Sequence, residues 1–395
     1  MGTITKHVFD IEDKEDFLRV RNELSSEGRL GGSELGTAVG DNKYKSPYAL
    51  WCEKIGVYEP DDPSEREATK QGVMFEDGVA KRFTQETGRK VYAPGYILTN
   101  SDAPHLFASP DRLLEDGESG LECKTAKEVV MKKFPHGDFP ASYYDQCVCY
   151  LKVTELKRWY LAIAVYSTSF NIYMMTTDKS EFDRWEYLKN KRKEMDTFTD
   201  EEKTEWDKNF SFLEACYYID EEALLACEQA AANFMARVEA GNNGNLDIWP
   251  EEEIDGSDST KKAIKSVFPQ AKPASIVTFD STDEYGIQND GEIYNKITGT
   301  EITRLVERHA EYKEAIAALE DELAKVDNLI MSKMQDKETF LVPNWKVTYK
   351  NKSGFRKVTV PDVEAYFAAE GKSIPDGLIK KSPDYRGLSF SRRKR

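Results

Sequence analysis

The sequence predicts an α/β protein in which helices flank a central mixed sheet, followed by a long C-terminal coiled-coil helix and a β-hairpin. Two observations lead to this prediction. In the first half, segments with helical spacing of apolar residues alternate with short runs rich in β-branched and aromatic residues. After residue 300, apolar residues recur at alternating intervals of three and four. Strands interrupted by a helix are typical of one mixed sheet.

The expected elements of the first half follow a simple order. Helices are expected at residues 47–55 and 67–87, before any long strand. Another helix, at 141–151, separates the third strand from the fourth. The strands are expected at residues 96–99, 106–115, 121–125, 159–166 and 170–177.

The C-terminal third carries the strongest periodic signal. Apolar side chains form an a/d seam over about four heptads, so this helix should pair with another helix, from this chain or a neighbour. We expect His309 to be a buried polar residue of the seam rather than a metal ligand. A hairpin is expected from strands at 340–350 and 355–360 around the turn 351–354. The seam residues are Ile302, Leu305, His309, Tyr312, Ile316, Leu319, Leu323, Val326 and Ile330.

Charge and composition suggest four segments. Residues 241–260 hold acidic residues without any Lys or Arg and are interpreted as a solvated linker. Residues 380–395 are basic, and either a solvated end or a phosphate-binding arm would explain them. The predicted segments are a core at 1–215, an acidic helical or linker region at 216–297, the coiled-coil helix at 298–336, and the hairpin with its basic tail at 337–395.

Composition also excludes some classes of protein. The longest apolar run, residues 160–166, is far shorter than the ~20 residues of a membrane span, and the first ten residues do not resemble a signal peptide. The six cysteines show no CxxC pair, so a disulfide scaffold is not expected and a reducing cytoplasm is the default. The net charge of −16 argues against a nucleic-acid coat protein, but it permits an enzyme with a locally basic groove.

One predicted hairpin could carry chemistry. Asp111 follows Ser109-Pro110 at a strand start, and the Gly-rich acidic loop 116–120 should form a tight turn. Glu122 and Lys124 lie two residues apart, so they should project from the same face of the next strand, beside Asp111. Two carboxylates next to a lysine favour Mg²⁺, which would polarise a phosphoryl oxygen and activate water. The alternative is an exposed strand face with a solvated salt bridge.

Five segments together resemble a known family. The chain is similar to the YqaJ-type viral recombinases, which are lambda-exonuclease-like phage nucleases of the PD-(D/E)xK class, over about residues 28–165. The resemblance implies a restriction-endonuclease-like core with a mixed sheet. The matching segments are Arg29 to Glu34 (RLGGSE), Ser46 to Trp51 (SPYALW) with Lys54-Ile55-Gly56, Gly72 to Glu76 (GVMFE), Ser109-Pro110-Asp111 with Leu121 to Ala126 (LECKTA), and Tyr143 to Tyr150 (YYDQCVCY).

This resemblance assigns a metal site and a catalytic lysine. Asp111 and Glu122 would bind the metal together with the carbonyl of Cys123, and Lys124 would be the catalytic lysine. Glu76 would supply a further carboxylate for a second ion. The implied cofactor is Mg²⁺, as two ions, with Mn²⁺ able to substitute.

The resemblance also assigns contacts to DNA. Gln146 and Tyr143 lie three residues apart on one helix face and would touch the scissile phosphate or the water; capping or packing is the alternative. Arg29 and Ser33 would hold a 5′-phosphate. Lys127 is the basic residue expected after the catalytic lysine, with Lys132 and Lys133 left open. The chain departs from the family pattern at Arg112, where Gly is usual, at Glu34, where Asp is commoner, and at Cys149, in place of a second Gln.

The function implied is a Mg²⁺-dependent 5′→3′ exonuclease that acts on double-stranded DNA ends and leaves 3′ overhangs for phage-type recombination. A single-strand annealing protein is the implied partner, a homo-oligomeric ring the implied assembly, and the cytoplasm of a bacterial or phage-infected cell the implied location.

An end- or structure-specific endonuclease on the same core is one alternative. A non-catalytic DNA-end-binding adaptor is the other, although the intact set of Asp111, Glu122, Lys124 and Gln146 argues against it. The absence of a GxxxxGK[ST] motif gives no support to an ATP-driven helicase–nuclease.

Overall fold

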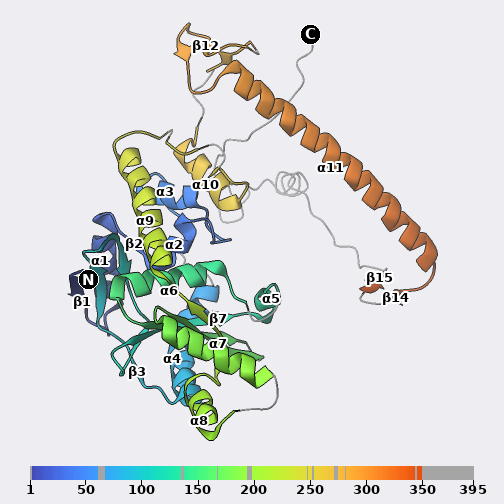
Figure 1. Cartoon of the computed structure of the whole chain (residues 1–395). Coiled ribbons are helices and arrows are strands. Elements are labelled where there is room, and N and C mark those ends of the chain that lie inside the picture. Colours follow the sequence, from blue (N-terminus) through green and yellow to red (C-terminus); the bar gives the residue numbers. More distant parts are fainter. Residues whose placement is uncertain are drawn as a thin grey trace, which may run out of the picture. The chain divides into compact units, whose positions relative to one another are not determined.

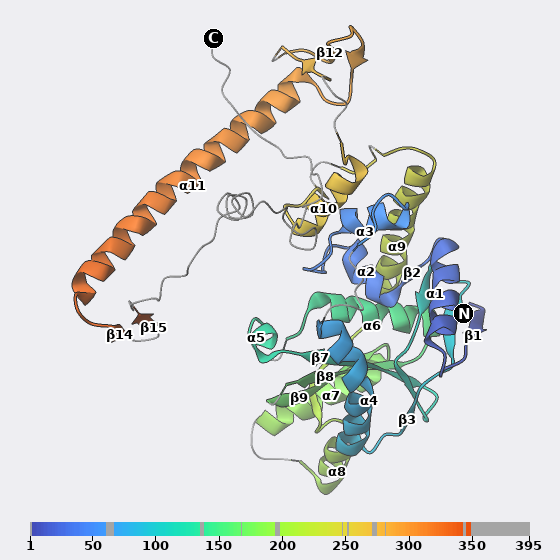
Figure 2. The same ribbon diagram turned by 180° about the vertical axis from the view of Figure 1, so that it is seen from behind.

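A computed structural model of the chain (Figures 1 and 2) contains two compact units, one ending at Phe268 and one beginning at Pro269. The first unit thus continues past residue 215 and includes the two helices that follow. Each unit is described by itself. The structure describes residues 2–60, 67–134, 138–166, 168–193, 198–246, 248–250, 253–270, 275–280, 282–342 and 345–348.

The first unit contains a six-stranded mixed sheet in the order β10-β9-β8-β7-β6-β3. The central pair β7 and β8 is parallel, β8 and β9 are antiparallel, and β9 and β10 are parallel again. The predicted mixed α/β sheet is therefore confirmed. Its strands are β3 (Val91–Tyr92), β6 (Arg112–Leu114), β7 (Ser119–Ala126), β8 (Arg158–Val165), β9 (Ser169–Thr176) and β10 (Leu213–Tyr218).

A second sheet of the same unit has four strands in the order β1-β4-β5-β2. Its strands are β1 (Ile4–Val8), β2 (Leu30–Gly31), β4 (Tyr96–Asn100) and β5 (Ala103–Ala108). The prediction of one strand at residues 106–115 is wrong, because β5 belongs to this sheet and β6 to the other. Pro110 lies in the break, and proline cannot donate a hydrogen bond to a strand ladder. The break leaves Asp111 at the junction of the two sheets.

Helices cover both faces of the six-stranded sheet (Figure 1). Helix α6 packs on β8 and is covered in turn by α2 and α9, whereas α4 packs on β7 and β8 and α7 packs on β9 and β10. The expected helices at 47–55, 67–87 and 141–151 correspond to α3, α4 and α6. The helices of the unit are α1 (Lys14–Ser26), α2 (Gly32–Ala38), α3 (Pro47–Lys54), α4 (Glu67–Thr87), α5 (Glu128–Met131), α6 (Ala141–Thr154), α7 (Lys179–Lys193), α8 (Asp200–Asn209), α9 (Glu221–Asn242) and α10 (Asp258–Val267).

The two faces of the sheet bury two separate hydrophobic cores. Along β8, Leu161 and Ile163 join the core under α6, while Tyr160 and Ala162 join the core under α4 and α7. Side chains alternate between the faces of a strand, so β8 contributes to both cores. The sheet is thus covered on both sides, and a polar side chain on it must find a partner inside the protein.

The interpretation of residues 241–260 as a solvated linker is wrong for part of the segment. Trp249 is buried, and its ring packs 5.8 Å from Tyr48, 5.7 Å from Trp51 and 6.2 Å from Phe234, measured between ring centroids. Helix α10 begins at Asp258 and packs on α3. An aromatic ring buries a large apolar area, which outweighs the acidic character of the residues around it.

The second unit contains a three-stranded sheet, one long helix and a hairpin. The sheet consists of β11 (Val277–Thr278), β12 (Gly286–Gln288) and β13 (Ile293–Tyr294). Helix α11 (Gly299–Met334) confirms the helix predicted at 302–330. A capping box starts it, since Thr298 Oγ1 accepts from the Glu301 backbone N–H and Glu301 accepts from the Thr298 backbone N–H.

A β-hairpin lies within the segment that is predicted to be a single strand. Strands β14 (Thr339–Val342) and β15 (Trp345–Thr348) pair antiparallel, with Val342 opposite Trp345. Residues 340–350 are therefore not one strand, and the intervening sequence is Pro-Asn, a turn-favouring pair. The expected turn at 351–354, the expected strand at 355–360 and the basic tail lie outside the described residues. No helix in the described part of the chain is long and apolar enough to cross a membrane.

We predict that Gly120→Ala destabilises the first unit by about 1–3 kcal/mol, because a Cβ there would lie 2.4 Å from the indole of Trp159. Trp159 is fully buried and sits opposite Gly120 in the β7–β8 ladder, so it has little room to move. The measurement is urea unfolding followed by tryptophan fluorescence. Gly78→Ala, in helix α4 with no atom within 4 Å of the added Cβ, is the control and should stabilise by roughly 0.5–1 kcal/mol. Equal midpoints for both variants would contradict this packing.

Candidate catalytic site on strand β7

Strand β7 carries the candidate site because its side chains alternate between the two cores. Leu121 and Cys123 belong to the core under α4, while Glu122 and Lys124 contact Gln146 of α6. The prediction that Glu122 and Lys124 share one face is therefore confirmed. Glu122 is only 2% exposed, so its charge must be compensated inside the protein.

Asp111 lies beside this pair, as the hairpin prediction required. Its Oδ2 accepts a hydrogen bond of 2.8 Å from the backbone N–H of Cys123. This bond ties the junction of the two sheets to the middle of β7. Asp111 from the loop and Glu122 from the strand consequently lie close together.

Gln146 and Lys124 complete a closed hydrogen-bond network around Glu122. Lys124 Nζ donates to Glu122 Oε1 at 2.6 Å and to Gln146 Oε1 at 2.9 Å. Gln146 Nε2 donates to Glu122 Oε1 and to Tyr150 Oη, each at 2.8 Å. Tyr150 Oη donates to the carbonyl oxygen of Ser109 at 3.0 Å. Each member orients the next, which locks the lysine and the amide in place.

Tyr143 lies one turn before Gln146 on α6 and borders the same group. Its ring centroid is 5.2 Å from Lys124 Nζ, within the range of a cation–π interaction. The spacing of three residues thus brings both side chains to Lys124, as expected from the helical period.

The electrostatics of the cluster favour an added positive charge. Burial, followed by repulsion from Glu122, raises the pKa of Asp111 to about 7. Burial also raises the pKa of Glu122. For Lys124, burial acts to lower the pKa, but attraction to Glu122 and Asp111 outweighs it and the pKa is raised. One lysine thus faces two carboxyl groups, and Glu122 Oε2 is buried without a hydrogen-bond partner in the described part of the chain.

The residues present fit a hard divalent cation. Carboxylate and carbonyl oxygens are the ligands that Mg²⁺ prefers, and Mg²⁺ usually keeps several waters when one or two carboxylates hold it. Asp111 and Glu122 are such carboxylates, and the Glu122 oxygen without a partner is a ready ligand. Within the described ranges, no group of three or more His, Cys, Asp or Glu side chains could hold a metal ion. Any ion here would therefore rely on backbone oxygen and water as well.

Glu76 comes close to the cluster but is engaged by an arginine. Arg112 is buried, and its Nη1 donates to Glu76 Oε1 at 2.7 Å and to the carbonyl oxygen of Asp111 at 2.5 Å. Its Nη2 contacts Asp77 on the same helix. Burial and then repulsion from Asp111 raise the pKa of Glu76. The departure from Gly at position 112 thus adds a cation that holds α4 against the Asp111 loop.

Arg29 and Ser33, which are predicted to bind a 5′-phosphate, have different side-chain partners. Arg29 Nη1 pairs with Glu27, and Arg29 Nε is buried without a partner among the described residues. Ser33 Oγ accepts from Arg21 Nη2 at 3.2 Å instead. Sequence reasoning missed Arg21, since nothing in the spacing of α1 indicates that it reaches α2.

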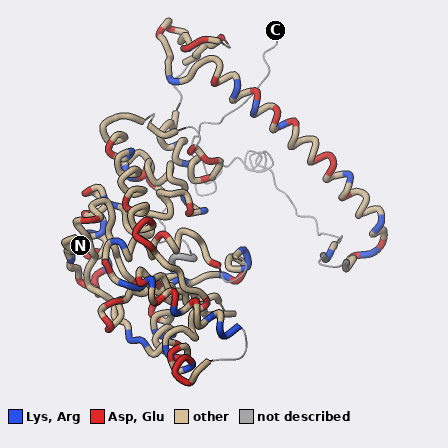
Figure 3. The backbone as a smooth tube through the Cα atoms, in the orientation of Figure 1, with Lys and Arg blue, Asp and Glu red and all other residues tan. Residues whose placement is uncertain are grey.

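The basic residues after Lys124 lie on the surface. Lys127 precedes α5 and is exposed, and Lys133 is exposed as well. Lys132 pairs with Glu128 across one helical turn at 2.9 Å. Figure 3 shows Lys and Arg residues at this short helix. The structure gives no contact that singles out one of the three.

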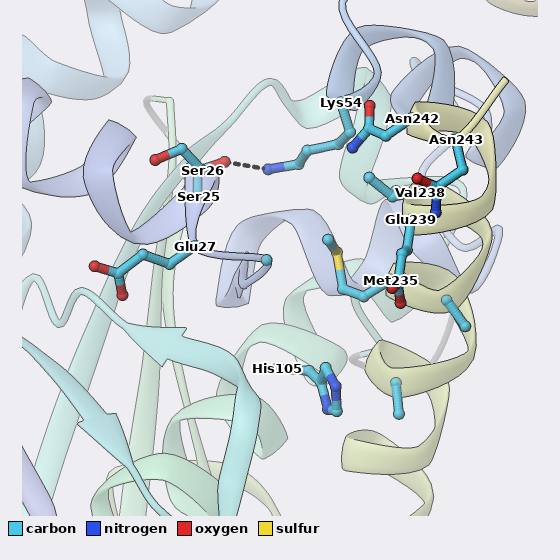
Figure 4. A pocket seen from close by; sticks show the side chains of 13 residues that line it. Ser25, Ser26, Glu27, Lys54, His105, Met235, Val238, Glu239, Asn242 and Asn243 are labelled. Carbon is cyan, nitrogen blue, oxygen red and sulfur yellow. Dashed lines mark hydrogen bonds between the residues drawn. The ribbon is translucent and has the colours of Figure 1, made fainter.

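A cavity of about 500 Å³ lies elsewhere, between the end of α1, the end of α3, strand β5 and α9 (Figure 4). Lys54 lines it and donates to Ser25 Oγ at 2.6 Å and to Glu34 Oε2 at 2.9 Å. On its far side, His105 Nδ1 lies 2.7 Å from Glu228 Oε1. Burial acts to raise the pKa of Glu34, but Lys54 and Arg21 outweigh it and the pKa is lowered. None of the predicted catalytic residues lines this cavity.

Comparison with known proteins identifies the segment that contains the cluster. Residues 16–157 match the family described as the YqaJ-like viral recombinase domain. Over this segment the chain is thus similar to the YqaJ-like viral recombinases. The uncharacterized protein YqaJ of Bacillus subtilis is 34% identical over 143 residues, which is 36% of this chain and 44% of that protein. The match thus spans less than half of the Bacillus protein.

Two solved structures show a weaker likeness. One is LHK-Exo in complex with dAMP, with a TM-score of 0.38 and 16% identity over 56% of this chain and 93% of that one. The other is an alkaline exonuclease, LHK-Exo from Laribacter hongkongensis, with a TM-score of 0.37 and 17% identity over 56% and 95%. A likeness at this level indicates neither the fold class nor the reaction of this chain.

We predict that Tyr150→Phe lowers stability by about 1–3 kcal/mol, because it leaves Gln146 Nε2 and the Ser109 carbonyl short of a buried partner. The measurement is the urea midpoint. Tyr144→Phe, on the same helix, is the matched control because no hydrogen bond of its hydroxyl is seen among the described residues. If the two variants unfold at the same urea concentration, the Tyr150 hydroxyl does not support the network.

Proposed function

We propose that this chain is a metal-dependent deoxyribonuclease that degrades double-stranded DNA from 5′ ends and leaves 3′ overhangs for phage-type recombination. The observation that carries the proposal is the hydrogen-bonded cluster of Asp111, Glu122, Lys124 and Gln146, in which Glu122 and Gln146 are buried. It combines two carboxyl groups with an immobilised lysine, the arrangement that phosphodiester hydrolysis needs. The YqaJ-like viral recombinase domain that contains it supports the recombination setting.

In this proposal, Asp111 and Glu122 bind Mg²⁺, or Mn²⁺ in its place, with the Cys123 carbonyl as a further ligand. The bound ion supplies Lewis-acid polarisation of the phosphate and a lowered pKa of the attacking water. Lys124 remains protonated beside Glu122, so it can orient that water and stabilise charge on the phosphate oxygens. Gln146 holds the lysine in position through its amide oxygen.

Glu76 and Tyr143 take supporting roles. Glu76 would help to hold a second ion, which requires that Arg112 yields one of its hydrogen bonds. Tyr143 would contact the scissile phosphate from its position over Lys124. With Asp111, Glu122 and Glu76 holding two ions, the attacking and leaving oxygens would both be stabilised.

End recognition would use the start of α2. Arg29 and Ser33 would hold the 5′-phosphate, because a guanidinium fork matches phosphate oxygens. Arg21 joins them in this proposal, since it already contacts Ser33. Lys127, exposed before α5, would meet the backbone further along the duplex. A single-strand annealing protein, a homo-oligomeric ring and a cytoplasmic setting complete the proposal.

We predict that Asp111→Ala, Glu122→Ala or Lys124→Ala lowers Mg²⁺-dependent degradation of linear duplex DNA by at least about a hundredfold, because charge stabilisation in the transition state is lost. The measurement is release of nucleotides from end-labelled duplex, with thermal unfolding to confirm the fold. Glu115→Ala, in the same hairpin but exposed, is the matched control and should keep full activity. Full activity of Asp111→Ala would remove the basis of the proposal, and cleavage of circular DNA by the unmodified protein would favour an endonuclease.

We predict that Arg29→Ala slows digestion of 5′-phosphorylated ends by roughly tenfold to a hundredfold and 5′-hydroxyl ends much less, since a charge-assisted contact of about 1.5–3 kcal/mol is lost. Arg21→Ala should act in the same direction. Arg19→Ala, which removes an exposed cation of α1 that pairs with Asp16 and Glu23, is the control. Equal slowing of both kinds of end by Arg29→Ala would show that Arg29 does not bind the phosphate.

A further inference from the structure

Helix α11 presents a long apolar stripe that no described residue of the second unit buries. Its seam side chains from Leu305 to Ile330 are between 37% and 70% exposed, apart from His309, which is partly buried. Figures 1 and 2 show α11 as one continuous rod. An apolar stripe of this length on a soluble surface marks a binding face.

The spacing of the stripe indicates what kind of element covers it. Intervals of three and four along the whole helix keep one seam facing a partner in a left-handed coiled coil. Ile302, His309, Ile316, Leu323 and Ile330 take the a positions of this heptad. Leu305, Tyr312, Leu319, Val326 and Lys333 take the d positions.

The flanking charges disfavour a parallel pair of α11 helices in register. In that arrangement each g residue faces the e residue five positions further along the other helix. Arg308 would then face Lys313, and Glu322 would face Asp327, so like charges would meet at both layers. His309 would also face its own copy within the seam.

The same charges are compatible with an antiparallel pair. If the two-fold axis passes between Ala317 and Ala318, each a residue lies beside a d residue of the second copy. Ile316 then meets Leu319 and His309 meets Val326. Flanking this seam, Lys313 faces Glu320 of the second copy, and symmetry makes this contact twice. No like charges meet at the e and g positions in this register.

We propose that α11 is an interaction surface for a second copy of this chain, and that the two α11 helices form an antiparallel coiled coil centred between Ala317 and Ala318. Charge complementarity favours a second copy as the partner, because Lys313 and Glu320 of the same helix can pair with each other across an antiparallel dimer. Figure 3 shows acidic and basic residues alternating along α11. This inference does not depend on the nuclease activity proposed above.

Charge reversal in the full-length chain tests the register. Lys313→Glu places a carboxylate opposite Glu320 and should raise the dimer dissociation constant about tenfold; Glu320→Lys should do the same. The double variant, Lys313→Glu with Glu320→Lys, should restore the original affinity. Glu307→Lys, at an outward f position, is the matched control and should leave it unchanged. Masses come from light scattering over a dilution series, against 45.1 kDa for one copy, and comparison with the Glu307→Lys control separates pairing of α11 from a ring formed by the rest of the chain.

Spin-label distances test the orientation directly. Labels on Thr303→Cys should lie about 45 Å apart in the dimer, at a rise of 1.5 Å per residue from the axis, and labels on Ser332→Cys should give the same distance. The six native cysteines are buried and should not be labelled. A distance below about 20 Å at both positions means a parallel pair and overturns the proposal. A single-copy mass at all concentrations also overturns it, because another segment of this chain or a different protein would then cover the stripe.

Discussion

Everything at the candidate site depends on keeping two carboxyl groups, the buried Glu122 and the partly buried Asp111, next to one ammonium group. A buried charge without a partner costs several kcal/mol, so the protein needs Lys124 at this place before any ligand arrives. The lysine in turn is held by Gln146, and Gln146 by Tyr150. Tyr150 donates to the Ser109 carbonyl oxygen, so this series of hydrogen bonds ends at the loop that carries Asp111. A continuous hydrogen-bond network therefore connects β7, α6 and the junction of the two sheets.

The sheet supplies the rigidity that this network requires. Both faces of β7 and β8 are covered by helices, and the apolar side chains of each strand are divided between the two cores. Gly120 leaves room for the Trp159 indole beside β7, and Trp159 packs 4.8 Å from Tyr150, measured between ring centroids. The hydrophobic packing under α6 and the polar network on the same face thus use the same tyrosine.

Local periodicity explains which parts of this arrangement could be predicted from sequence. The period of two placed Glu122 and Lys124 together, and the helical period brought Tyr143 and Gln146 to Lys124. Pro110 signals the break between β5 and β6, whereas the apolar run around it favours one continuous strand. Arg21 and Trp249 could not be predicted, because their partners lie in other elements and only tertiary packing brings them together. The roles of Arg29, Ser33 and Lys127 stay predictions for the same reason.

The pairing of β2 with β5 limits the distance between Arg29 and Asp111. Gly31, two residues after Arg29, lies opposite Phe107 in the ladder, and Asp111 follows only four residues later. A chain of four residues spans at most ~14 Å, so Asp111 cannot move far from β2, which directly follows Arg29. If a DNA end is anchored at Arg29, the number of nucleotides between the anchored end and the cut is then determined by a hydrogen-bonded ladder. Insertions in surface loops would leave that number unchanged, whereas a one-residue slip of β2 would alter it.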